Sequence, residues 1–218
     1  MNRAPGQEIH EALNARFLEV DGQGTPAQYG NVSAEYAAVQ ESAGVLDLSG
    51  RGRLCLLGAD RQRFLHGQVT NDVNRLQIGE GCYAALVTAK GKMVSDLNVY
   101  RLTEEILLDF EPGYTQKIFD RLSHFIIADD VQIIDAAPHY GLLSVQGPRA
   151  AEVIRETYRG LAVPEKPWSF VRCQNDAPGE IYVMNHPRTG SAGFDVFIPT
   201  DGRQREMAKL KQDYTDAV

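Results

Sequence analysis

Two extended segments of the sequence, 81–88 (GCYAALVT) and 93–101 (MVSDLNVYR), lie on either side of the tetrapeptide 89–92 (AKGK). Both segments are rich in aliphatic, β-branched and aromatic residues, and the peptide between them contains a glycine, so the pattern predicts a β-hairpin. Side chains alternate between the two faces along a strand. The second strand is therefore expected to carry four side chains on one face: Val94, Asp96, Asn98 and Tyr100.

The length of the loop decides which residues of the first strand join that face. A loop of two or four residues pairs Tyr83 with Asn98 and Ala85 with Asp96, which brings Tyr83, Asp96, Asn98 and Tyr100 into one polar and aromatic patch. A three-residue loop would shift the register and place Tyr83 on the opposite face.

Such a patch suits a flat, polar heteroaromatic ligand. Tyrosine rings offer contact area at a low cost in conformational entropy, and an ionised carboxylate accepts hydrogen bonds from ring N–H or amino groups. The Asp96 carboxylate is also a candidate for proton transfer. The alternative is that Asp96 is a solvated residue on an open sheet face and that the tyrosines are ordinary strand residues.

The rest of the chain predicts an α+β fold with antiparallel or mixed sheets backed by helices. Residues 52–136 follow the order β-α-β-β-β-α-β and are expected to form an inserted, ferredoxin-like α+β domain. Residues 1–51 and 137–218 are expected to pack together as a discontinuous first domain. Apolar residues at helical spacing in 7–18 predict an amphipathic first helix.

Charge and composition exclude several classes of function. The net charge is −7 and the basic residues are scattered, whereas a nucleic-acid-binding protein is expected to carry a basic surface. The apolar stretches are too short to span a bilayer, and the first residues (MNRAPGQEIHEALN) do not resemble a secretory signal. Three dispersed cysteines indicate neither a disulfide framework nor a metal site. We expect a cytoplasmic protein with no nucleic-acid or membrane partner.

A series of motifs, in order, resembles the folate-binding family of aminomethyltransferases, the T-protein of glycine cleavage. The resemblance covers roughly residues 30 to 200. The matching segments are E-x-x-A-V-x-x-x-A-G-x-x-D-x-S (35–49), G-x-D-x-x-x-F-L (58–65), T-N-D-V (70–73), G-x-x-x-Y (79–83), K-G-x-x-x-x-D-L-x-V-Y-R (90–101), HFIIADDVQIID (124–135) and LLSVQGPRA (142–150).

This resemblance implies a fold, a cofactor and partners. The family has three domains in a cloverleaf with tetrahydrofolate in a central hole; by this resemblance we expect the fold without the usual C-terminal barrel domain. The family's reaction releases ammonia from an aminomethyl-lipoyl carrier protein and leaves methylene-tetrahydrofolate. The implied partners are a folate, a small one-carbon donor and a lipoyl carrier protein.

The resemblance also assigns roles to residues. Asp96 resembles the family's catalytic acid, which orients the folate and handles a proton. Tyr83 and Tyr100 match positions that line the folate site, and Asn98 shares their face. Asn71 and Asp72, in the T-N-D-V segment, match a loop beneath the same site; a purely structural turn is the alternative for them.

The segment 188–195 (RTGSAGFD) resembles the family's R-T-G-x-x-G-x-x-G-F-E, three residues longer, whose final acid binds the amino edge of the pterin. Asp195 would be that residue; alternatively, it is an exposed residue of a strand. His10 is a candidate for the family's histidine near the N-terminus, although we expect it at the surface.

A second branch of the family, the YgfZ-type folate-binding proteins, acts in iron–sulfur cluster maintenance and carries a K-G-C-Y-x-G-Q-E signature with a reactive cysteine. Gly81-Cys82-Tyr83 matches only part of that signature, so we interpret Cys82 as a packing residue. Three hypotheses follow. The chain is a tetrahydrofolate-dependent aminomethyltransferase-like enzyme, a non-catalytic YgfZ-like module that assists iron–sulfur cluster proteins, or a scaffold that binds no folate.

Overall fold

The structure is a computed structural model that describes residues 7–20, 23–173 and 179–212. It divides into two compact units. Unit 1 contains the described residues of 1–50, 140–167 and 171–218, and unit 2 contains residues 51–139 and 168–170. The short segment 168–170 thus belongs to unit 2, although the residues before and after it belong to unit 1.

Unit 1 is built on a five-stranded sheet with the strand order β10-β11-β12-β9-β3. The pairs β11–β12, β12–β9 and β9–β3 are antiparallel. The helices and strands are α1 (Gln7–Ala12), β1 (Arg16–Val20), β2 (Gln23–Gln28), α2 (Val32–Glu41), β3 (Gly44–Asp47), β9 (Tyr140–Gln146), α5 (Ala150–Thr157), β10 (Phe170–Cys173), β11 (Ile181–Asn185), β12 (Gly193–Pro199), the 3-10 helix η2 (Thr200–Gly202) and α6 (Arg203–Gln212).

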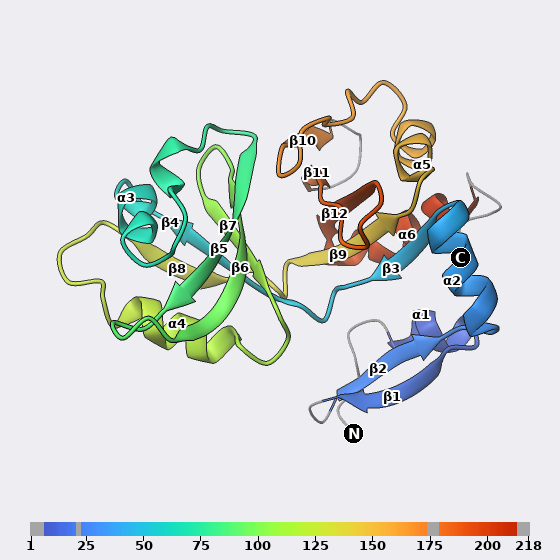
Figure 1. The fold of residues 1–218 in the computed structure, drawn as a ribbon, viewed down its shortest axis with the longest axis horizontal. Coiled ribbons are helices and arrows are strands. Elements are labelled where there is room, and N and C mark those ends of the chain that lie inside the picture. The colour runs from blue at the N-terminus through green and yellow to red at the C-terminus, as the bar shows by residue number, and fades with distance from the viewer. Residues whose placement is uncertain (1–6, 21–22, 174–178, 213–218) are drawn as a thin grey trace. The chain divides into compact units, whose positions relative to one another are not determined.

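The core of unit 1 lies between this sheet and the helices α5 and α6 (Figure 1). Val145 of β9 and Val196 of β12 pack against Val153 of α5 and Leu210 of α6. Because side chains alternate along a strand, the residues between these apolar positions point to the other face of the sheet. Asp195 is one of them.

The N-terminal part of unit 1 differs from the expectation of one helix over 7–18. Helix α1 ends at Ala12, and Asn14 has a left-handed φ of 58°. Asparagine is one of the few residues that tolerate this conformation, and it redirects the chain. Phe17 and Leu18 therefore lie in β1, which pairs antiparallel with β2. The expected helix was wrong beyond residue 12.

Unit 2 is a five-stranded sheet with the order β5-β6-β7-β4-β8, in which every neighbouring pair is antiparallel. The helices and strands are β4 (Gly52–Leu57), α3 (Arg61–His66), the 3-10 helix η1 (Val73–Arg75), β5 (Glu80–Val87), β6 (Met93–Arg101), β7 (Ile106–Phe110), α4 (Thr115–Ser123) and β8 (Gln132–Asp135). The expected α+β fold with antiparallel sheets and helices is confirmed.

The sheet of unit 2 has one apolar and one polar face. On the apolar face, Leu97 and Val99 of β6 and Leu108 of β7 pack with Phe64 of α3 and Ile118 of α4. The residues in alternate positions point away from this core. We call the opposite side the polar face; its members on β5, β6 and β7 are Tyr83, Asp96, Asn98, Tyr100 and Asp109.

The hairpin of β5 and β6 has the register expected from a symmetric loop. Tyr83 lies opposite Asn98, and Ala85 lies opposite Asp96. The register shifts only next to the loop, where Val87 pairs with Met93. This shift between Leu86 and Val87 sets the pairing of the polar face, because the Val87–Met93 register continued without it would place Ala85 opposite Ser95. The predicted register is confirmed.

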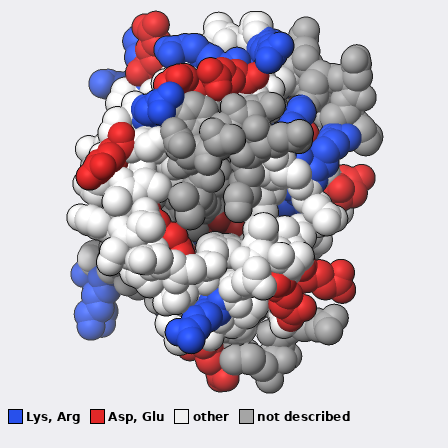
Figure 2. Space-filling model, turned by 90° about the vertical axis from the view of Figure 1, so that its right-hand side faces the viewer, with Lys and Arg blue, Asp and Glu red and all other residues white. Residues whose placement is uncertain are grey.

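Figure 2 shows one face of the surface, on which acidic and basic side chains are mixed. On the face shown in Figure 2, Lys and Arg lie near Asp and Glu, and much of the described surface between them is uncharged. No helix among the described residues is long and apolar enough to cross a membrane. Within the same residues, no group of three or more His, Cys, Asp or Glu side chains is arranged to hold a metal ion.

Candidate functional site

Tyr83 and Asp96 form a hydrogen-bonded pair on the polar face of unit 2. The Tyr83 hydroxyl donates to Asp96 Oδ2 over 3.0 Å. This bond raises the pKa of Tyr83, with smaller contributions from desolvation and from the Asp96 charge. Tyr83 is 50% exposed and Asp96 is half-buried, so the pair is open to solvent. A phenol ring and a carboxylate are therefore available together to one ligand.

The segment that contains Asn71 and Asp72 fastens the edge of β5 beside Tyr83. Asn71 Nδ2 donates to the Tyr83 carbonyl oxygen over 2.9 Å, and Thr70 Oγ1 accepts from the Ala85 N–H at the same distance. The Asp72 carboxylate instead pairs with Arg75 Nε at 2.9 Å, outside the Tyr83–Asp96 pair. The Asn71 hydrogen bond thus supports the strand that carries Tyr83, while the Asp72 carboxylate contacts Arg75 in its own turn and, at 3.3 Å, His66 Nδ1 of α3.

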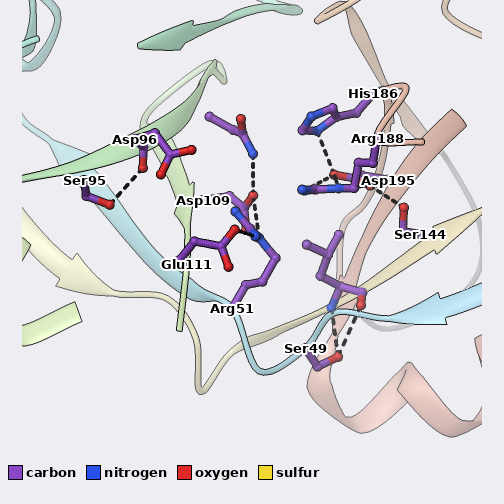
Figure 3. A network of polar contacts seen from close by, with 12 residues as sticks. Ser49, Arg51, Ser95, Asp96, Asp109, Glu111, Ser144, His186, Arg188 and Asp195 are labelled. Carbon is purple, nitrogen blue, oxygen red and sulfur yellow. Dashed lines mark hydrogen bonds and ion pairs between the residues drawn. The ribbon is translucent and has the colours of Figure 1, made fainter. Parts of the chain in front are cut away.

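A buried ionic network adjoins Asp96 on the polar face, and the sequence interpretation missed it. Asp109 of β7 is 0% exposed. Its carboxylate accepts hydrogen bonds from Asn98 Nδ2 at 2.7 Å and from Arg51 Nε at 2.9 and 3.1 Å. Arg51 also pairs with Glu111 (Figure 3). A buried carboxylate needs such donors to offset its lost hydration. The Asn98 side chain thus donates to Asp109 rather than to Asp96 or Tyr83.

Tyr100 lies beneath two aromatic side chains from a distant part of the sequence. It is 0% exposed, and its ring centroid lies 6.3 Å from that of Trp168 and 6.0 Å from that of Phe170. The Trp168 ring also lies 6.2 Å from the Tyr83 ring. Four aromatic residues thus lie together at the polar face. The sequence motifs predicted Tyr83 and Tyr100 but not Trp168 and Phe170.

Asp195 lies in unit 1, on the face of the sheet opposite the core, and is 0% exposed. The alternative that it is an exposed strand residue is therefore wrong. Its carboxylate accepts hydrogen bonds from Ser144 Oγ at 2.7 Å, from Arg188 Nη2 at 2.6 Å and Nε at 3.0 Å, and contacts His186 Nδ1 at 3.0 Å (Figure 3). Burial by itself raises the pKa of Asp195, but the His186 and Arg188 contacts outweigh it and hold that pKa at about 2.

The glutamine of the adjacent strand fixes the R-T-G segment around Asp195. Gln146 Nε2 donates to Ser144 Oγ at 2.8 Å and to the His186 carbonyl at 3.0 Å, and its Oε1 accepts from the Arg188 N–H at 2.9 Å. Gly193 faces Gln146, and a Cβ at this position would lie 2.1 Å from Gln146 Oε1. The glycine of the motif is thus required by the close approach of a neighbouring side chain.

His10 is buried in unit 1, which corrects the expectation that it lies at the surface. It is 2% exposed. Its Nε2 lies 3.1 Å from Asp47 Oδ2, and its Nδ1 lies 2.8 Å from the Tyr29 hydroxyl. Beside this group is a cavity of about 570 Å³ whose lining includes Tyr29, Tyr36, Glu35 and Asp47. None of the predicted folate-site residues lines this cavity.

Cys82 occupies a packing position on β5. Its side chain is half-buried and lies against the apolar core of unit 2. Desolvation, together with the nearby charge of Asp72, raises the pKa of its thiol to about 11. Since the thiolate is the reactive form, this environment disfavours a nucleophilic role for Cys82.

The chain is similar in sequence to a known protein family and to known proteins of that family. The family described as "GCVT N-terminal domain" matches residues 7–213. An aminomethyltransferase of Rubrobacter xylanophilus is 32% identical over 198 residues, which is 91% of this chain and 53% of that protein. A probable aminomethyltransferase of Halobacterium salinarum is 32% identical over 208 residues, or 93% of this chain and 57% of that protein.

Solved structures agree with this assignment. The glycine cleavage system aminomethyltransferase T from Bartonella henselae matches with a TM-score of 0.88 and 25% identity over 100% of this chain and 58% of that one. A chain of the heterotetrameric sarcosine oxidase from Corynebacterium sp. U-96 has the same fold, with a TM-score of 0.60 and 18% identity over 83% of this chain and 89% of that one. The chain spans about half the length of the aminomethyltransferases that it matches. The chain belongs to the GCVT N-terminal domain family.

Proposed function

We propose that this chain binds tetrahydrofolate on the polar face of unit 2 and takes part in aminomethyltransferase-like one-carbon transfer. The donor in this proposal is an aminomethyl group on a lipoyl carrier protein, and the products are ammonia and methylene-tetrahydrofolate. The observation that carries the proposal is the exposed Tyr83–Asp96 pair, in which the hydroxyl and the carboxylate lie 3.0 Å apart.

The chemistry of these residues fits a reduced pterin. A pterin ring is flat and carries N–H and amino donors, which a carboxylate accepts and an aromatic ring stacks against. The folate would supply the nitrogen that accepts the one-carbon unit. Asp96 would orient the ring through hydrogen bonds and hold or pass a proton beside that nitrogen. Tyr83 would keep the Asp96 carboxylate in place through its hydroxyl.

The neighbouring network supports this role for Asp96. A binding group needs a rigid surrounding to hold its geometry. Asp109, Asn98 and Arg51 form a buried, charge-assisted set of hydrogen bonds within the same sheet. We propose that Asn98 contributes by fixing this set, and that Asn71 contributes by holding the Tyr83 carbonyl.

The buried Asp195 has a separate proposed role in unit 1. Its oxygens accept hydrogen bonds from Arg188 and Ser144 and contact His186. We propose that Asp195 acts through Arg188 as a positioning residue, by fixing the plane of the guanidinium. The Arg188 side chain is 17% exposed, so this cation is the part of the network that a ligand reaches.

The decisive experiment separates binding from turnover. Tetrahydrofolate is titrated calorimetrically into the intact chain and into Asp96→Asn, and turnover is measured with an aminomethyl-lipoyl carrier protein. We expect Asp96→Asn to retain measurable binding, because the amide is isosteric and keeps one acceptor oxygen, and to lose roughly 100-fold or more in turnover, the usual contribution of a general acid or base. Asp120→Asn, on the exposed side of α4, is the matched control and should change neither quantity.

Three outcomes bear on the competing hypotheses. Binding with turnover that depends on Asp96 supports the transferase. Binding without turnover in the unmodified chain supports the alternative of a non-catalytic, YgfZ-like folate-binding module that assists iron–sulfur cluster proteins. If the chain binds no folate at millimolar ligand, both of these hypotheses are contradicted, and the third hypothesis, a scaffold that binds no folate, is supported.

A further inference from the structure

Trp168 has an unusual backbone conformation beside the candidate site. It is the single tryptophan of the chain. Its φ is 66°, and among the described residues the other non-glycine residue with positive φ is Asn14. Asparagine adopts this conformation readily, but a bulky residue adopts it against a steric cost. Such strain persists only where the surrounding structure enforces it, and it concentrates at functional sites.

The structure enforces this conformation by fastening the segment 168–170 to the edge of β5. The Phe170 N–H donates to the Gly79 carbonyl over 2.8 Å, and Ser169 forms an antiparallel bridge with Glu80. Gly81 completes the fit, because a Cβ there would lie 3.2 Å from the Trp168 carbonyl oxygen and 2.6 Å from Tyr100 Cδ1. The backbone contacts therefore fix where the indole lies.

The indole is thereby held against both tyrosines of the polar face. Its ring is tilted by 40° to the Tyr83 ring and by 35° to the Tyr100 ring. Phe170 meets Tyr100 edge-on, at 89°, and is itself buried, so it supports the group from within. Trp168 is half-buried, so part of its surface remains accessible, and its ring contacts Tyr83, which is itself 50% exposed.

We propose that Trp168 is a ligand-binding residue: its indole is the wall against which the flat ring bound by Tyr83 and Asp96 stacks. Asp96 supplies hydrogen bonds at the edge of that ring, and the indole supplies contact with its face. The site thus selects a planar, electron-rich heterocycle with donors on its edge. This inference rests on the proposed function, in which the heterocycle is the pterin of tetrahydrofolate.

The single tryptophan makes the contact directly measurable. All tryptophan fluorescence of the chain comes from residue 168. We expect saturating tetrahydrofolate to shield the indole, so that acrylamide quenches its emission less in the complex than in the free chain. The bimolecular quenching constant, which is the Stern–Volmer constant divided by the fluorescence lifetime, reports accessibility independently of quenching by the ligand itself. An unchanged bimolecular constant in the complex contradicts the inference.

Two substitutions test the energetic role. Trp168→Gly removes the ring, and glycine adopts a positive φ without strain, so the fold should be retained. Its affinity for tetrahydrofolate, measured by calorimetry, should fall roughly tenfold, as when a base loses a stacking partner. Trp168→Phe keeps an aromatic face and should stay within about threefold of the unmodified chain. Tyr114→Ala, which removes an exposed ring beside Lys117, should have no effect.

The outcomes distinguish this inference from the proposed function. If the unmodified chain binds tetrahydrofolate and Trp168→Gly binds it equally well while remaining folded by circular dichroism, the stacking role is wrong and the proposed function stands. If the unmodified chain does not bind tetrahydrofolate, the proposed function fails first. A graded loss, small in Trp168→Phe and large in Trp168→Gly, supports the stacking role.

Discussion

Arg188→Met should destabilise unit 1 strongly, because it removes the main partner of a buried carboxylate. The guanidinium contacts Asp195 through Nη2 at 2.6 Å and through Nε at 3.0 and 3.1 Å. Breaking a buried ion pair costs about 3–5 kcal/mol, because the remaining charge is left without compensation. Ser144 and His186 still reach Asp195, so we expect a loss near the lower end, about 3 kcal/mol.

The same substitution should change the acid stability in a defined direction. The pKa of Asp195 is about 2 in the folded chain, below the ordinary value of 3.8 for an aspartate. A lowered pKa contributes stability that is complete above pH about 4 and is lost as the pH falls through about 2. A difference of nearly two pKa units corresponds to about 2 kcal/mol. Without Arg188, burial raises the pKa of Asp195, so the variant is destabilised most when Asp195 is ionised, and its deficit should shrink as acid protonates that carboxylate.

The measurement is urea denaturation followed by circular dichroism from pH 7 to pH 3. Arg172→Met is the matched control, because Arg172 pairs with Glu180 at an exposed site and such pairs contribute less than about 1 kcal/mol. Arg188→Met should lose about 3 kcal/mol at pH 7, and this difference from the unmodified chain should shrink as the pH falls from 5 to 3, because protonation of Asp195 relieves the uncompensated charge. A loss below about 1 kcal/mol with an unchanged acid profile would refute the ion pair as the support of Asp195.

Three further predictions concern packing. Gly193→Ala should cost about 1–3 kcal/mol in urea denaturation, because its Cβ would displace Gln146 from three hydrogen bonds; an unchanged midpoint would contradict this. Cys82→Ala should leave folate affinity and turnover unchanged in titration and activity assays, whereas a folded but inactive variant would favour a reactive cysteine. His10→Ala should lower the free energy of unfolding by about 1–3 kcal/mol, since buried Asp47 loses a partner; a cost below about 0.5 kcal/mol would count against this contact.

The register of the hairpin was predictable because it depends on local information. The alternation of apolar and polar residues fixes the face of Asp96, and the loop together with the register shift beside it, between Leu86 and Val87, fixes its partner Ala85. The motif resemblance pointed to the same face independently. These residues lie within 20 positions of one another, so no long-range contact had to be guessed.

The first helix was predicted too long because periodicity alone does not mark its end. Ile9 and Leu13 pack on the core of unit 1 as a helical stripe would, but Asn14 adopts a left-handed conformation that breaks the helix. Phe17 and Leu18 happen to continue the same spacing in β1. An asparagine after a short apolar stripe was the available signal.

The partners of the buried charged residues were not predictable from the sequence, because they meet only when strands and helices far apart in the chain pack together. Asp109 lies in an otherwise apolar strand, which is a signal that a charged residue is buried there, but the sequence does not name Asn98 and Arg51 as its donors. The segment of Trp168 reaches β5 from almost 90 positions away. Similarly, His10 of α1 contacts the Asp47 carboxylate of β3 only because the two elements pack together in the folded chain.

The location of bound tetrahydrofolate tests the account most directly. Tyrosine rings labelled with ¹³C give NMR signals that Tyr→Phe substitutions assign to positions. On titration of tetrahydrofolate into the intact chain, we predict saturable shifts of the Tyr83 and Tyr100 signals, with those of Tyr29 and Tyr36 unchanged. Shifts confined to Tyr29 and Tyr36, at the cavity of unit 1, would contradict the assignment of the folate site to the face that carries Asp96.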